Sequence, residues 1–169
     1  MRRFFFTSIA ALALMSPAAA ADKITIGQAF PLATALRSLD GHIVVIKQNG
    51  ADATVMVPWD FGSGALRLRI ANNLAILDAV ANTVNDTRLK IVKEIIKNSA
   101  NPAATEIKPG TPEFDDFQRQ YNEMMIQPAN GTQDLARIKA SELRLDKNEI
   151  PVTVITALKP ILEDDVSAK

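Results

Sequence analysis

The chain has 169 residues, with 19 basic side chains, 19 acidic side chains, one histidine and no cysteine. The absence of cysteine excludes disulfide scaffolds, thiol nucleophiles and cysteine-ligated zinc, and a single histidine excludes metal motifs that need two. A balanced charge argues against nucleic acid as a partner, because phosphate binding needs a surplus of basic side chains. We therefore expect no metal, no cofactor and no nucleic-acid ligand.

The first 21 residues have the pattern of a secretory signal peptide. Arg2 and Arg3 give a positive start, residues 4–15 form an apolar run, and an A-x-A cleavage site ends at Ala21. The run is too short to cross a bilayer, which takes ~20 apolar residues. Its Ala-rich character is typical of bacteria. We expect cleavage after Ala21, a periplasmic or secreted location without stable membrane insertion, and a single globular domain over residues 22–169.

The mature chain begins with a predicted strand and a predicted helix. Lys23–Ile26 alternates polar and apolar residues, which favours a short strand. Apolar residues at helical spacing then predict a helix over residues 30–40, with Pro31 in its first turn. Gly41 follows and suits the left-handed conformation that often ends a helix.

A β-hairpin is predicted next. His42–Lys47 and Ala53–Val57 are rich in β-branched residues, and the Asn49-Gly50 pair between them is a strong signal for a tight turn. Two strands alone are only marginally stable in water. We therefore expect the hairpin to pack on a helix or to pair with Lys23–Ile26.

The candidate binding segment is the loop of residues 58–64. It contains two aromatic residues, Trp59 and Phe61, and two glycines, Gly62 and Gly64. The loop precedes a predicted helix N-terminus, which is a generic site for anions. Two interpretations stay open: the aromatic side chains form a binding surface, or Trp59 closes one end of the hydrophobic core.

One long helix is predicted over residues 65–97. Large apolar residues recur at every seventh position: Ile70, Leu77, Val84 and Ile91. Residues 85–87 could cap a second helix after a break, and Arg88 interrupts the apolar pattern, so it pairs with an acid, extends to solvent or marks that break. The apolar stripe is wide enough to need cover from more than one side. We therefore expect a protein partner or a homodimer through the 65–97 helix.

The remainder is predicted to alternate loops and short elements. Prolines and glycine make residues 98–110 a loop. A helix follows with Thr111 as its N-cap and a proline at its first position. Partial alternation favours a short strand within residues 135–145. Asn148 is predicted to cap a final helix, with Pro151 inside its first turn.

Few residues point to catalysis. His42 is the only side chain that titrates near neutral pH, and residues 62–64 match neither a nucleophile elbow nor a phosphate-binding loop. We therefore assign no catalytic residue. The alternative is a small hydrolase with a carboxylate-based site, and it requires acids such as Asp60, Asp115 and Glu142 to meet in one pocket.

Four segments together resemble a known group of proteins. They are Ala35–Gly41, Pro58–Phe61, Leu68–Leu77 and Asn148–Pro151. Their order is similar to that in small, uncharacterised proteins found among phage and prophage genes, in which a helical segment with an Asn-Leu pair precedes a long charged helix. The resemblance spans most of the mature chain and implies a mainly helical domain, without catalytic residues to transfer. The signal peptide is a departure from that group.

The sequence thus predicts an α+β, mainly helical fold. A β-hairpin, or three short strands, packs on three to four helices that include one long helix. The favoured function is that of an exported, non-enzymatic interaction protein. The alternatives are a small-ligand or anion-binding protein that uses the 59–64 loop, and the small hydrolase.

Overall fold

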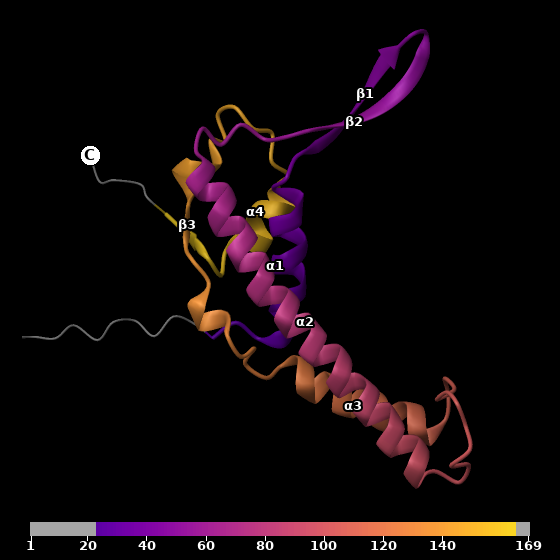
Figure 1. Cartoon of the computed structure of the whole chain (residues 1–169). Helices are drawn as coiled ribbons and strands as arrows, with labels where there is room; N and C mark the ends of the chain where they lie inside the picture. Colours follow the sequence, from indigo (N-terminus) through magenta and orange to yellow (C-terminus); the bar gives the residue numbers. More distant parts are fainter. Residues whose placement is uncertain (1–22, 165–169) are drawn as a thin grey trace, which may run out of the picture.

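The computed structural model describes residues 23–164, so the predicted signal peptide and the last five residues lie outside the described part (Figure 1). The fold is α+β and mainly helical, as predicted. Its elements in chain order are α1 (Ile26–Ser38), β1 (His42–Gln48), β2 (Ala51–Val57), α2 (Gly64–Asn98), α3 (Pro112–Met125), the 3-10 helix η1 (Thr132–Asp134), β3 (Ile138–Lys139), the 3-10 helix η2 (Ala140–Leu143), α4 (Val152–Leu158) and β4 (Leu162–Glu163).

Helix α1 begins earlier than predicted. Thr25 forms a capping box with Gln28: its hydroxyl accepts from the Gln28 N–H at 3.3 Å, and its own N–H donates to the Gln28 side chain at 2.9 Å. The predicted strand at Lys23–Ile26 is therefore wrong, and only an isolated bridge joins Thr25 to Pro128. Pro31 lies in the helix interior rather than in the first turn.

Helix α2 is one continuous helix of 35 residues, about 52 Å long at 1.5 Å per residue. The Ser63 hydroxyl caps it by accepting from the Ala65 N–H at 3.1 Å. The break considered at residues 85–87 does not occur. Arg88 is exposed and donates to the Asn85 side chain, so it extends to solvent without interrupting the helix.

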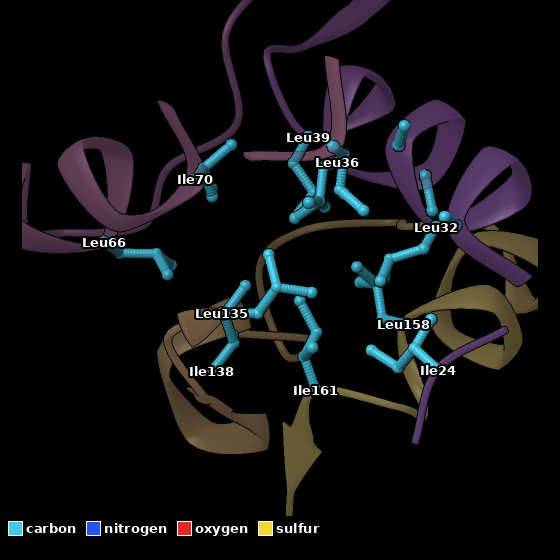
Figure 2. Close-up of a cluster of buried hydrophobic side chains, with 14 of the residues drawn as sticks. Ile24, Leu32, Leu36, Leu39, Leu66, Ile70, Leu135, Ile138, Leu158 and Ile161 are labelled. Atoms are coloured by element: carbon cyan, nitrogen blue, oxygen red, sulfur yellow. The ribbon is translucent and has the colours of Figure 1, made fainter. Parts of the chain in front are cut away.

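The core lies between α1, the first half of α2 and the C-terminal segment. Figure 2 shows side chains from these elements converging on one cluster: Leu32, Leu36, Leu39, Leu66, Ile70, Leu135, Ile138, Leu158 and Ile161. In the seven-residue repeat of α2, Ile70, Leu77 and Val84 are buried and Ile91 is half-buried. Helices α1 and α3 both pack against α2. Elements of the same chain therefore cover the apolar stripe, for which the sequence analysis expected a partner.

Helix α3 packs along the second half of α2 (Figure 1). Thr111 is its N-cap, as predicted, and accepts from the Phe114 N–H at 3.3 Å. Phe117 and Tyr121 stack with ring centroids 5.7 Å apart. No residue of α3 is fully buried. Helix α3 and the second half of α2 therefore form an extension of the body with few buried side chains.

The short strand predicted within residues 135–145 forms, but it is only two residues long. Within residues 135–145 only Ile138–Lys139 pairs, in parallel with β4, and the 3-10 helix η2 follows directly at residues 140–143. One reason is that the Asn73 side chain of α2 hydrogen-bonds both backbone groups of Ala136. Its amide nitrogen donates to the carbonyl at 2.9 Å, and its oxygen accepts from the N–H at 2.8 Å. Asn148 is not a helix cap: Pro151 holds that position in α4, and Asn148 is buried elsewhere.

The hairpin forms as predicted, but it does not pack on the helices. Strands β1 and β2 pair in antiparallel register from His42–Val57 to Gln48–Ala51. Asn49 and Gly50 have φ of 53° and 82°, which is the type I′ turn expected of Asn-Gly. The strands project from the body (Figure 1), and within residues 23–164 no third strand pairs with them. The Asn-Gly turn and the register are local features, so they form the pair but do not determine which surface covers it.

Candidate functional site

The hairpin arm, residues 42–57, carries the largest concentration of exposed apolar side chains in residues 23–164. Twelve large hydrophobic residues are exposed in that part of the chain, and six of them lie on the arm. The six are Ile43, Val45, Ile46, Val55, Met56 and Val57. Such a concentration on a projecting element is typical of an interaction site.

Both faces of the arm carry exposed apolar side chains, and one of them also carries Thr54, Lys47 and Asp52. The register places Ile43, Val45 and Met56 on one face, where each is more than 60% exposed. The opposite face carries Ile46, Val55 and Val57, about 40% exposed, with Val44 between them. An antiparallel sheet in water usually keeps one polar face. This arm has no such face.

The tip of the arm differs from its middle. Lys47 and Asp52 are the only charged side chains of the two strands, and they are direct cross-strand partners. Gln48 and Asn49 add further polar groups at the turn. The arm therefore has no net charge, and its apolar residues lie between a polar tip and the body.

The base of the arm depends on one glycine and one aromatic stack. A Cβ on Gly41 would lie 2.4 Å from the Val57 carbonyl oxygen, so no larger residue fits where the two strands leave the body. His42 stacks on Trp59, with ring centroids 4.3 Å apart. The Trp59 indole N–H donates to the Ser38 carbonyl at 3.0 Å. These contacts fix the exit of both strands.

The base loop, residues 58–63, is held by Asn148. The Asn148 side chain is buried; it accepts from the Asp60 N–H at 3.0 Å and donates to the Asp60 and Leu143 carbonyls at 3.0 and 2.8 Å. Arg144 donates to the Asp60 carboxylate at 3.0 Å. Because a buried amide with three partners has little freedom, the loop is a rigid support for the arm.

The residues predicted to bind a ligand anchor this support. Trp59 and Phe61 are 7% and 4% exposed and belong to the core, so their rings do not form a surface. Arg67 donates to the Trp59 carbonyl at 2.7 Å and lies over the Phe61 ring. Gly62 has a φ of 68° and lies against Arg144, and Gly64 begins α2. Ligand binding by this loop stays a prediction, and the buried rings of Trp59 and Phe61 would not contact the ligand.

The candidate carboxylates do not meet. Asp60 pairs with Arg144, and Glu142 pairs with Arg69, whose guanidinium lowers the pKa of the Glu142 carboxyl. Asp115 lies in α3, beside the far half of α2 (Figure 1). Within residues 23–164, no three His, Asp or Glu side chains are placed to hold a metal ion. Asp60 and Glu142 are therefore each held in an ion pair, which gives them a structural role.

A small surface cavity lies away from the base loop. Its volume is about 260 Å³, and its floor includes the buried residues Ile24, Leu135 and Ile161. Lys23 and Arg137 are the charged residues that line it. The cavity can accommodate a small anionic molecule.

No helix in the described part of the chain is long and apolar enough to cross a membrane.

Sequence reasoning missed the arm as a site because it assumed that the strands would be covered. A signal was present: Ile43, Val44, Val45 and Ile46 are consecutive apolar residues, whereas a half-covered strand alternates apolar and polar residues.

Comparison with protein-family models, curated proteins and solved structures finds no match.

Proposed function

We propose that the protein is an exported, non-enzymatic interaction protein that binds another polypeptide through its hairpin arm. The observation that carries the proposal is the pair of apolar faces on an arm that projects from the body. The proposed export rests on the signal-peptide pattern of residues 1–21.

Burial of the arm would stabilise a complex. Fully burying one Val, Ile or Met side chain contributes about 1.5–3 kcal/mol, and the arm offers six that are only partly covered. Association has an entropic cost, which is smaller when the binding element is already held in place. The bonds from Asn148 and the stack of His42 on Trp59 provide that rigidity.

The arm suits a protein better than a lipid bilayer. A hairpin that enters a membrane leads with its tip, and this tip carries Lys47, Gln48, Asn49 and Asp52. Charged groups are costly in the hydrocarbon region. A protein partner can instead cover the two faces and pair with a strand edge.

The long helix is a weaker candidate for the contact. Its apolar stripe is covered by α1 and α3, and Leu68 and Leu89 are its only exposed large hydrophobic residues. They lie about six turns apart at 3.6 residues per turn, too far to form one patch. The arm therefore replaces the 65–97 helix as the proposed binding element.

Site-specific cross-linking tests the proposal. Because the sequence has no cysteine, Met56→Cys can carry a single photoreactive label, and the exposed Gln118→Cys on α3 is the matched control. We expect a discrete protein adduct in the native compartment from the arm label and none from the control. The adduct should disappear when Ile43→Ser and Val45→Ser make the arm polar. Equal labelling from both positions, or adducts with lipid alone, would contradict the proposal.

Export has its own test. The protein recovered from the cell envelope or the medium should begin at Asp22, as shown by intact mass and N-terminal sequencing. Recovery of the full 169-residue chain from the cytoplasm would remove this part of the proposal without affecting the arm.

A further inference from the structure

We infer that the partner of the arm is a second copy of this chain, joined to it through the free edges of the two β1 strands. This inference rests on the proposed function and names its partner. Two arms paired antiparallel about Val45 would form a four-stranded sheet in the order β2–β1–β1–β2. Sheets of three or more strands with an apolar face are stable where an isolated hairpin is marginal.

The backbone of β1 is positioned for this pairing. In an antiparallel pair, alternate residues direct their N–H and C=O groups toward the neighbouring strand, and the others direct them outward. Gln48 and Ala51 flank the tight turn, so they face each other. By alternation, Ile43, Val45 and Lys47 present their backbone groups at the outer edge. A two-fold axis at Val45 brings those three residues opposite their counterparts.

The side chains match across this axis. Val45 lies opposite Val45 of the second copy, and Val44 lies opposite Ile46, so the centre of each face is apolar. Lys47 lies opposite Ile43, and a lysine stem covers apolar surface while its ammonium stays in water. No like charges meet. Apolar β-branched pairs of this kind stabilise an antiparallel sheet.

The other edge of the arm is less suitable. The corresponding axis on β2 passes through Thr54 and places Asp52 opposite Met56 on each side. A short carboxylate cannot extend away from an apolar neighbour as a lysine can. Pairing through β1 is therefore favoured over pairing through β2.

The structure places no obstacle at the β1 edge. Proteins protect free edges with prolines, bulges or charged residues; β1 has no proline or bulge, and its one charged residue, Lys47, lies near the tip. The arm is about 24 Å long at 3.4 Å per residue. Antiparallel pairing puts the tip of each arm beside the base of the other, so the two bodies lie at opposite ends of the sheet.

Disulfide trapping tests the pairing and its axis. Val45→Cys places two thiols across the proposed axis, where Cα atoms lie about 5.5 Å apart, within the range that a disulfide spans. Thr54→Cys is the matched control, since Thr54 is the cross-strand partner of Val45 on the same face. We expect mild oxidation of the mature protein to give a disulfide dimer with Val45→Cys and not with Thr54→Cys.

A charge-swap experiment makes the result independent of disulfide chemistry. In sedimentation experiments the unmodified mature protein should be a dimer. Val45→Lys and Val45→Glu should each be a folded monomer by circular dichroism, because like charges meet at the axis, and their mixture should form a heterodimer. A monomeric parent protein, a dimer that survives Val45→Lys, or trapping by Thr54→Cys would overturn the inference.

The two proposals fail separately. If the parent protein is monomeric but the Met56 label gives a discrete adduct with another polypeptide, the arm is a binding element and the second copy is not its partner. If the arm label gives no specific adduct and the parent protein is monomeric, both proposals fail.

Discussion

Removal of the Asn148 side chain should destabilise the whole fold. Asn148→Ala deletes three hydrogen bonds that join the base loop to the η2 segment, and it leaves the Asp60 N–H and two carbonyls without partners. A hydrogen bond contributes about 0.5–1.5 kcal/mol net, so three give an expected loss of about 3 kcal/mol in the free energy of unfolding. For a domain of this size that corresponds to a fall in Tm of about 6–12 °C.

Trp59 makes the assay direct. It is the only tryptophan of the chain and precedes Asp60, so its fluorescence during urea unfolding follows the region that the substitution affects. Asn82→Ala, at an exposed position of α2, is the control and should change stability by less than ~0.5 kcal/mol. Asn148→Asp should destabilise at least as much as Asn148→Ala at pH 7, because it removes both donors and places a second carboxylate beside Asp60.

A loss below ~1 kcal/mol for Asn148→Ala would refute this reasoning. It would mean that water replaces the amide at little cost and that the aromatic side chains and the contacts of Arg67 and Arg144 suffice to hold the base loop. The same result would weaken the view that the arm is presented rigidly, since Asn148 is the main polar link between the loop and the body.

Three further predictions concern the core, a surface ion pair and the base of the arm. Leu77→Ala should cost about 2–5 kcal/mol in urea unfolding, whereas Leu89→Ala, at an exposed position of the same helix, should cost less than ~1 kcal/mol; similar losses would contradict the placement of the stripe. Because the hydrogen bond from Arg69 lowers the pKa of Glu142 in the folded state, this carboxylate stabilises the fold above its unfolded pKa, near 4.3. The excess stability of the parent protein over Glu142→Gln should be full at pH 6 and should disappear as the pH falls through the folded pKa; thermal unfolding from pH 7 to pH 3 would show it, and a pH-independent difference would not fit. Gly41→Ala should loosen the exit of the arm, seen as faster amide hydrogen exchange in β1 and β2 with little change in the helices; unchanged exchange would show that the strands shift to admit the methyl group.

Much of the fold was predictable because its signals are local. The Asn-Gly turn, the Thr111 cap and the seven-residue repeat of α2 each depend on neighbours within a few positions, and each appears where the sequence places it. The strand predicted at Lys23–Ile26 fails for a similar reason. A capping box between Thr25 and Gln28 starts a helix there and overrides a weak alternation.

The candidate site was less predictable because it depends on what does not cover the arm. A run of apolar residues in a hairpin indicates burial, and the sequence does not say which surface provides it. Likewise, Asn148 has the sequence features of a cap, and only its contact with Asp60, 88 positions away, reveals its role.

The sequence by itself determined the signal-peptide pattern, the mainly helical class and the existence of the hairpin, since composition and short-range spacing set all of these. Only the tertiary structure decided that α1 and α3 cover the long helix, that Trp59 and Phe61 lie in the core, and that the arm projects uncovered. Those outcomes depend on which surfaces distant segments bury against each other. A pattern along one chain segment indicates that a face is apolar, and packing decides what meets it.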